Sequence, residues 1–178
     1  MKKLGIFGGT FNPIHNGHLR MADAAQKEYK LSYVYFMPCG IPPHKRKEKL
    51  LPAKLRCELI LKAIKRKKYF KLLDTEIKHS SVPNYTIETI KELKKKKFTK
   101  NKELYFLIGS DEFEKLATWQ KANELARLVI FLVLPRLPIK LKVPEIKNLK
   151  WHLVHTKPIN ISSTEIRKKV RLQSYPSH

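Results

Sequence analysis

The sequence is poor in cysteine and in long hydrophobic runs, and each shortage excludes a class of protein. Cys39 and Cys57 are the only cysteines among 178 residues and form no CxxC pattern, so no disulfide framework is possible and both thiols are expected to be reduced. The longest apolar run, 128–134, is far too short to cross a bilayer. Glycines interrupt the apolar stretch after the N-terminal lysines, which excludes a signal peptide. These absences favour a cytoplasmic protein with no membrane partner.

Acidic residues are scarce as well, and the net charge of +23 comes from 38 lysines and arginines against 15 acidic residues. A pI of about 10.1 is typical of nucleic-acid-binding proteins. Arginine, on which specific nucleic-acid readers rely, nevertheless supplies only eight of the basic residues. The lysines gather at the polar ends of helical patterns, as in 65–68 and 94–97. The composition therefore favours solvated lysine-rich faces over specific nucleic-acid binding, and either would attract nucleotides.

Apolar strand patterns alternate with helical patterns along the whole chain. Strands are predicted at 2–8, 31–37, 69–74, 103–111, 128–134 and 150–156, and helices at 17–29, 52–67, 87–97, 120–127 and 161–170. The central strands are unbroken apolar runs, as expected for parallel strands covered on both faces. We therefore predict a single domain, 1–178, with a doubly wound, mostly parallel α/β sheet of the Rossmann-like kind. Ligands of such sheets bind at the carboxyl ends of the strands, near the switch point.

The first strand-to-helix junction, GIFGGTFNPIHNGHL, combines several features that suit an anion. Gly8 and Gly9 are expected to let the backbone turn sharply and approach a ligand closely, and Gly17 to do the same where the helix begins. Backbone N–H groups at a helix start favour a negative charge, and the imidazoles of His15 and His18 add side-chain donors. The junction therefore suits a phosphate group that gains negative charge during a reaction.

Two other interpretations of these histidines compete with phosphate binding. A zinc site would need a further ligand, and His44, His79, His152 and His155 offer no clear set. Alternatively, the two imidazoles serve only the core or the surface. The glycines match neither GxGxxG nor GxxxxGK[ST], which excludes the standard dinucleotide and P-loop motifs.

A second candidate phosphate site lies near the C-terminus, in the segment ISSTEIR (161–167). It places hydroxyls at the start of a predicted helix and an arginine one turn further on. A single hydroxyl would be enough for an ordinary N-cap. Combined with the N-terminal junction, however, the segment predicts a second phosphate-binding helix N-terminus.

These motifs resemble the nucleotidyltransferase superfamily that is marked by HxGH and a C-terminal SSTxxR. Within it, the segments MPCGIPPHK (37–45), NYTIETI (84–90) and GSDEFEKLATWQ (109–120) are most similar to bacterial nicotinate-nucleotide adenylyltransferases. Two features depart from that family. Asn12 stands where the family often has Asp, and we assign it no catalytic role. The segment after Arg167 is shorter than usual, which leaves packing over the last helix and homo-oligomerisation open.

The resemblance implies transfer of the adenylyl group of ATP to nicotinate mononucleotide, which gives deamido-NAD and pyrophosphate in NAD biosynthesis. Such an enzyme needs no protein nucleophile, because its task is to align the acceptor phosphate and to neutralise charge on the leaving group. Mg²⁺ is expected on the ATP phosphates with few or no protein ligands. One alternative is an adenylyltransferase for nicotinamide mononucleotide or phosphopantetheine. The other is a basic nucleic-acid-binding module without catalysis, which would have no reason to keep both HxGH and SSTEIR.

The same resemblance implies a role for individual residues. The catalytic candidates are His15, His18, Lys45 and Arg167. ATP is expected to contact Gly8, Gly9, Thr10, Phe11, His15, His18, Gly109, Asp111, Ile161, Ser162, Ser163 and Arg167. Nicotinate mononucleotide is expected to contact Gly8, His44, Lys45, Tyr85, Thr86 and Trp119. Thr86 is also expected to cap the helix that follows it, and Trp119 has the alternative of a plain core aromatic. No residue is assigned to a metal.

Overall fold

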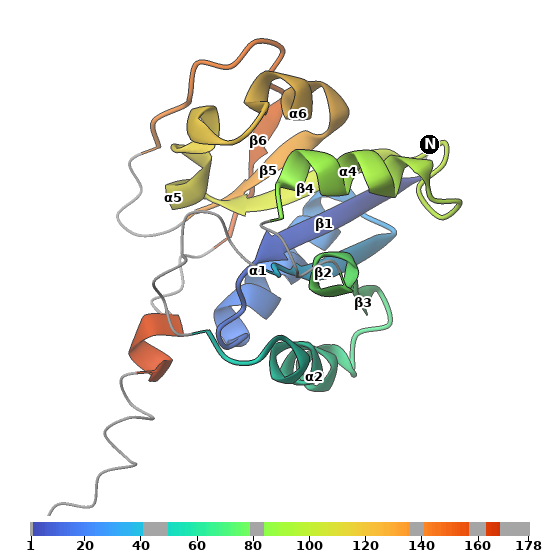
Figure 1. The fold of residues 1–178 in the computed structure, drawn as a ribbon, viewed down its shortest axis with the longest axis vertical. Coiled ribbons are helices and arrows are strands. Elements are labelled where there is room, and N and C mark those ends of the chain that lie inside the picture. The colour runs from blue at the N-terminus through green and yellow to red at the C-terminus, as the bar shows by residue number, and fades with distance from the viewer. Residues whose placement is uncertain (1, 41–49, 79–83, 136–140, 157–162, 168–178) are drawn as a thin grey trace, which may run out of the picture.

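The computed structural model describes residues 2–40, 50–78, 84–135, 141–156 and 163–167, and these contain one parallel sheet (Figure 1). Its six strands are β1 (Lys3–Gly9), β2 (Tyr33–Pro38), β3 (Phe70–Leu72), β4 (Glu103–Gly109), β5 (Ile130–Leu134) and β6 (Trp151–Leu153). Their order is β3-β2-β1-β4-β5-β6, and every neighbouring pair is parallel. The prediction of a doubly wound parallel sheet is confirmed. The switch point lies between β1 and β4, from which the chain proceeds outward in both directions.

The helices include four predicted ones and three short ones that the sequence analysis missed. The predicted ones are α1 (Asn16–Tyr29), α2 (Ala53–Ile64), α4 (Thr86–Lys95) and α6 (Ala122–Leu128). The missed ones are α3 (Thr75–Lys78), α5 (Ser110–Phe113) and the 3₁₀ turn η1 (Leu116–Thr118). Each of these spans about one turn, which is too short to show a periodicity. Of the helix predicted over 161–170, residues 163–167 are described and are helical.

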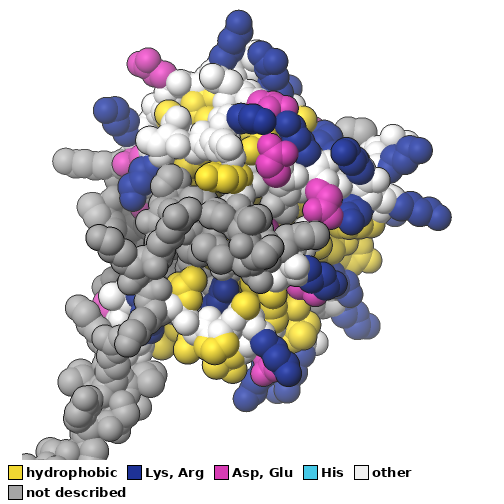
Figure 2. Space-filling model, in the orientation of Figure 1, with side chains coloured by type: hydrophobic (Ala, Val, Ile, Leu, Met, Phe, Trp, Pro, Cys, Tyr) yellow, Lys and Arg dark blue, Asp and Glu magenta, His cyan; other side chains and the backbone are white. Residues whose placement is uncertain are grey.

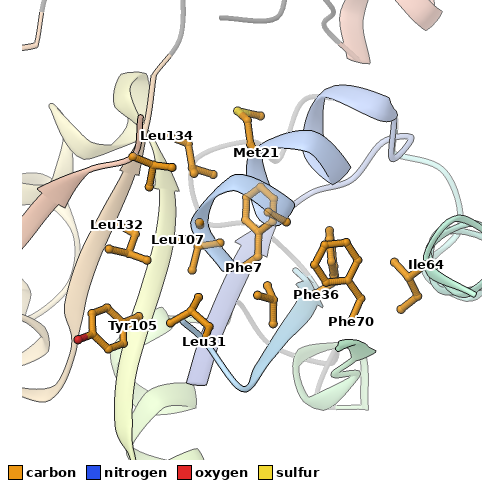
Figure 3. Close-up of a cluster of buried hydrophobic side chains, with 14 of the residues drawn as sticks. Phe7, Met21, Leu31, Phe36, Ile64, Phe70, Tyr105, Leu107, Leu132 and Leu134 are labelled. Atoms are coloured by element: carbon orange, nitrogen blue, oxygen red, sulfur yellow. The ribbon is translucent and has the colours of Figure 1, made fainter. Parts of the chain in front are cut away.

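Two apolar clusters cover the two faces of the sheet, because successive strand residues point to opposite sides. On one face, Met21 of α1 and Ile64 of α2 belong to one cluster with strand residues, in which Ile64 lies beside Phe36 and Phe70 (Figure 3). On the other face, Ile90 of α4 packs against the strands together with residues of α5, η1 and α6. The central strands are buried on both sides, which explains why they read as continuous apolar runs.

The glycine pair at the end of β1 does not form the sharp turn that the sequence analysis predicted. β1 stays paired with β2 through Gly9, which lies opposite Pro38, and none of the described glycines has a positive φ. The pair instead makes room for aromatic rings. A Cβ on Gly8 would lie 2.8 Å from Cζ of Phe106, and one on Gly9 would lie 3.2 Å from Cζ of Phe11. In this segment the left-handed backbone conformation occurs two residues after the glycine pair, at Phe11, with φ 43°.

The lysine-rich surface is dispersed. Basic side chains are spread around the face seen in Figure 2, with carboxylates between them. Exposed pairs join Lys91 to Glu124 and Lys96 to Glu92, each at 2.8 Å. This distribution fits solvated faces. None of the helices in the described ranges combines the length and the apolar character that crossing a bilayer requires.

Candidate active site

The predicted ATP-contacting residues at the ends of β1 and β4 gather at the switch point. Phe7 of β1 lies opposite Leu107 of β4, so two residues further on each strand ends in a glycine, Gly9 and Gly109. Thr10 and Phe11 follow Gly9 directly. Asp111 follows Gly109 in the first turn of α5, half-buried. The carboxyl edge of the two central strands therefore carries all of these residues.

His15 and His18 cap α1 reciprocally. His15 is the N-cap residue, so the helix begins at Asn16. Nδ1 of His18 accepts the backbone N–H of His15 at 3.3 Å, and the His15 ring accepts the backbone N–H of His18. The two rings stack with centroids 3.8 Å apart and planes inclined by 31°. The sequence suggested phosphate donors, zinc ligands or core and surface residues as interpretations of this pair, whereas their i, i+3 spacing is also that of a capping box.

The cap decides which nitrogen of His18 can donate. A nitrogen that accepts a backbone N–H carries no proton, so the neutral His18 ring holds its proton on Nε2. The side chain is buried, with 7% of its surface exposed, against the rings of Phe7 and Phe11. The imidazole is thus fixed in orientation as well as in tautomer, which is what a preorganised donor requires.

The C-terminal motif docks onto the N-terminal junction. Oγ of Ser163 donates to the carbonyl of Pro13 at 3.0 Å, and Nη1 of Arg167 donates to the carbonyl of Asn12 at 2.7 Å. The side chain of Asn12 is buried and its Oδ1 accepts the backbone N–H of Leu51 at 2.9 Å. Asn12 therefore bridges the loop after β1 to Leu51 and to Arg167. Two segments about 150 residues apart meet beside His15.

Arg56 of α2 is a residue of this site that the sequence analysis counted only toward net charge. It is 2% exposed, and its guanidinium donates to the carbonyl of Thr10 at 2.8 Å and to that of Leu51 at 3.1 Å. The signal was present, since Arg56 opens a buried stripe that continues with Ile60 and Ile64 at i+4 and i+8. An arginine in such a stripe indicates a buried polar target. Here that target is the loop after β1.

The residues predicted to meet the acceptor lie toward the opposite face of the sheet. The ring of Trp119 is half-buried and packs edge-on against Phe106 with centroids 6.2 Å apart, and Phe106 in turn contacts Gly8. Tyr85 and Thr86 begin α4, which covers the same face. The N-cap is Tyr85, so the prediction that Thr86 caps the helix is wrong. The backbone of Thr86 is already helical, and this residue occupies the first position of α4.

Four further site residues that the sequence analysis named fall outside the described residues. They are His44, Lys45, Ile161 and Ser162.

Glu76 of α3 is a second residue that the sequence analysis missed, since α3 itself shows no pattern. Its side chain is 5% exposed, and Oε1 accepts the hydroxyl of Thr89 at 3.0 Å. The backbone N–H of Gly40 is its other donor. Burial raises the pKa of this carboxyl to about 7, although both hydrogen bonds act in the opposite direction.

Known proteins match this chain over most of its length. Residues 6–169 match a family model described as cytidylyltransferase-like. The chain is 37% identical to a "Probable nicotinate-nucleotide adenylyltransferase" of Clostridium acetobutylicum, over 98% of this chain and 90% of the relative. It is 39% identical to a protein of the same name from Dehalococcoides mccartyi, over 94% and 85%.

Solved structures show the same fold. The Plasmodium falciparum nicotinic acid mononucleotide adenylyltransferase complexed with NaAD superimposes with a TM-score of 0.77 at 22% identity, over 94% of this chain and 83% of that one. The same enzyme complexed with APC gives a TM-score of 0.73 at 21% identity, with the same coverage.

Proposed function

The chain belongs to the cytidylyltransferase-like family, and we infer that it is an enzyme of NAD biosynthesis that transfers the adenylyl group of ATP to nicotinate mononucleotide. The products are deamido-NAD and pyrophosphate. The observation that carries this inference is the docking of Ser163 and Arg167 on residues 12–13, beside the paired imidazoles of His15 and His18. That docking brings the two motifs together at one place, which supports their assignment to the phosphates of ATP.

The donors suit the charge that moves in this reaction. An oxygen of the acceptor phosphate attacks the α-phosphorus of ATP, and the bond from that phosphorus to the bridging β-oxygen breaks. The acceptor phosphate has a second pKa of about 6, so it is largely dianionic at neutral pH and no proton has to be removed. Negative charge grows on the leaving pyrophosphate. We assign Nε2 of His18, His15 and the guanidinium of Arg167 to its oxygens, with Ile161, Ser162 and Ser163 beside them. The hydroxyl of Ser163 donates to the carbonyl of Pro13 and so holds this segment in place.

Mg²⁺ is assigned to the ATP phosphates, where it would neutralise part of their charge. The side chains at the phosphate end support this assignment, because imidazole N–H, hydroxyl and guanidinium groups are donors to phosphate. Within the described ranges, no three or more His, Cys, Asp and Glu side chains group in a way that could hold a metal ion.

The other end of ATP is assigned to β4. Gly109 ends that strand and Asp111 stands in the turn that follows. We assign the backbone of the glycine and the carboxylate of the aspartate to the adenosine ribose. A carboxylate at the carboxyl end of a parallel strand is a common acceptor for ribose hydroxyls. Gly8, Gly9, Thr10 and Phe11 would lie along the nucleotide between its two ends.

The acceptor is assigned to the face that carries α4. The Thr86 hydroxyl and the first N–H groups of α4 are donors, and donors suit the two oxygens of a carboxylate better than the NH₂ of an amide. The half-exposed ring of Trp119 can stack on the pyridinium ring. Lys45 and His44 are proposed to meet the acceptor phosphate. Tyr85 completes this set as the residue that begins the helix.

A pyrophosphate-release assay tests the proposal. ATP is combined in turn with nicotinate mononucleotide, nicotinamide mononucleotide and phosphopantetheine. We expect kcat/KM for nicotinate mononucleotide to exceed that for the amide by roughly 10- to 100-fold, because a donor facing the NH₂ leaves a buried polar mismatch. Equal values, or a preference for either of the other acceptors, would overturn the assignment. The proposal includes a cytoplasmic location without specific nucleic-acid binding, and it leaves the oligomeric state open.

A matched pair of arginine variants tests the phosphate site. Arg167→Ala is expected to lower kcat by at least about 100-fold, since it removes a charged donor to the leaving group. Arg127→Ala, at the exposed end of α6, removes the same charge elsewhere and should leave kcat unchanged. Equal effects of the two substitutions would show that Arg167 acts only through net charge.

A further inference from the structure

We propose that Glu76 is a positioning residue for the acceptor side of this site, because its carboxylate ties the carboxyl end of β2 to the first turns of α4. This proposal rests on the proposed function. Within the described residues, the side chain of Glu76 bonds to Thr89 and to Gly40. It acts through the residues to which it is bonded.

The first bond leads to the start of α4. The hydroxyl of Thr89 lies 3.0 Å from Oε1 of Glu76 and 3.4 Å from the carbonyl of Tyr85, and the backbone N–H of Thr89 also donates to that carbonyl at 3.3 Å. Thr89 is 7% exposed, so its hydroxyl is held among protein partners. The carboxylate therefore reaches Tyr85 and Thr86 through one intervening side chain.

The second bond leads to the end of β2. The backbone N–H of Gly40, two residues beyond the strand, donates to Glu76. Gly40 is also clamped sterically, because a Cβ at this position would collide with the Asn84 side chain and with the carbonyl oxygen of Glu76. Only glycine fits so close an approach of three segments. Asn84 is the residue directly before Tyr85, so the clamp and the hydrogen bond hold the same two pieces of chain together.

Along the chain, this junction adjoins two groups of residues that are assigned to the acceptor. Gly40 precedes the segment that carries His44 and Lys45, and Asn84 precedes Tyr85 and Thr86. His15 and His18, which are assigned to the phosphates, stand at the start of α1, on the opposite face of the sheet. A change at Glu76 should therefore affect the acceptor and leave ATP unaffected.

The chemistry of the junction requires an acceptor at this position. Two donors converge on the buried carboxyl, and an apolar side chain of similar size would leave both without a partner. Burial disfavours the charged form of this carboxyl, as the raised pKa of Glu76 shows. A buried carboxyl that only filled space would therefore be unfavourable. Its hydrogen bonds are what the position supplies.

Steady-state kinetics on four variants test the proposal. Thr89→Val keeps the shape and removes the hydroxyl, and Thr89→Ser keeps the hydroxyl. Glu76→Leu removes both acceptor oxygens, and Glu76→Gln keeps one. We expect Thr89→Val and Glu76→Leu to raise KM for nicotinate mononucleotide by about tenfold with KM for ATP within twofold, and Thr89→Ser and Glu76→Gln to stay within about threefold.

Thr99→Val is the matched control. Thr99 is 4% exposed, and its hydroxyl donates to the carbonyls of Leu93 and Lys96 at the other end of α4. This variant loses a buried hydroxyl that bonds to the C-terminal end of the same helix, and it should be destabilised without any change in either KM. The proposal is overturned if Thr89→Val leaves the acceptor KM within twofold of wild type, if both KM values rise together, or if Thr99→Val has the same effect.

Hydrogen exchange without substrate separates this proposal from the proposed function. Thr89→Val is expected to speed amide exchange at residues 84–89 by about tenfold relative to wild type, whereas Thr99→Val leaves those amides unchanged. If the wild-type protein fails to join ATP to nicotinate mononucleotide, the proposed function fails and the exchange rates still decide whether Glu76 holds this junction. Equal exchange at 84–89 in both valine variants would refute it.

Discussion

Replacing Glu76 with glutamine is expected to remove a pH dependence of folding stability that the wild-type protein shows between pH 4.5 and 7. The pKa of this buried carboxyl is about 7 in the folded protein, against an ordinary value of 4.5. Between those values the native state binds a proton that the unfolded chain has released. The free energy of unfolding therefore falls as pH rises through the window, and the stabilisation is fully present only below pH 4.5.

The size of the effect follows from the difference between the two pKa values. It corresponds to about 3 kcal/mol, which is a large fraction of the stability of a typical domain. Little of it should be lost to solvent screening, because the side chain is only 5% exposed. Glutamine has nearly the same shape and keeps an oxygen for Thr89 or Gly40, but it does not ionise. The variant should therefore gain stability relative to wild type as the pH rises.

Urea unfolding of both proteins from pH 4.5 to pH 8 measures this difference directly. Subtracting one curve from the other cancels carboxylates that titrate alike in both, including Asp23, whose pKa three hydrogen-bonding neighbours hold well below its usual range. Glu88→Gln, on the exposed side of α4, corrects for the loss of one carboxylate from the net charge. We expect the wild-type value minus the Glu76→Gln value to fall by about 3 kcal/mol. A constant difference across the window would refute the reasoning.

Three other substitutions and one binding measurement test the remaining features. His18→Ala should lower kcat by roughly two to four powers of ten and weaken ATP binding less, because a preorganised donor matters most when charge develops; near-wild-type turnover would remove His18 from the reaction. Arg167→Lys keeps the charge but loses the planar fork that holds Asn12 and Thr164, so kcat/KM for ATP should fall about tenfold; full activity in steady-state assays would mean that charge alone suffices. Gly8→Ala should cost about 1–3 kcal/mol in thermal or urea unfolding and raise the acceptor KM, because the new Cβ displaces Phe106 and with it Trp119. Gly5→Ala is its control, since a Cβ there meets Leu31 and is expected to destabilise without changing KM. Binding of nucleic acid, measured by fluorescence anisotropy at several salt concentrations, should be weak and lost at physiological salt; tight, sequence-dependent binding there would contradict the view of the lysines as solvated faces.

The sequence by itself was enough to predict the layered architecture, and it singled out the strand-to-helix junction that carries His15 and His18. Unbroken apolar runs such as 103–109 and 130–134 indicate strands that are buried on both faces, and helices long enough to show a period separate them. His15 and His18 stand at a helix start, where local spacing alone places their rings side by side. These signals are local, because strand and helix formation depend on residues a few positions apart.

Features that depend on the approach of distant segments were predicted incompletely or wrongly. The glycines of β1 suggested a sharp turn, but the rings of Phe106 and Phe11 are what require them. In the sequence Arg56 counted only toward the net charge, although its side chain is buried against the loop after β1. Thr86 looked like an N-cap, yet the helix takes Tyr85 in that position.

Only the tertiary structure could show that Arg167 reaches Asn12 and that Glu76 joins Gly40 to Thr89. Arg167 and Asn12 lie 155 positions apart, and α3, which carries Glu76, is too short to show a helical periodicity in the sequence. A hydrogen bond between such groups depends on how the helices settle on the sheet, which is set by packing over the whole core. The sequence gives the polar groups, but which of them bond to each other depends on the tertiary packing, which excludes water from between them.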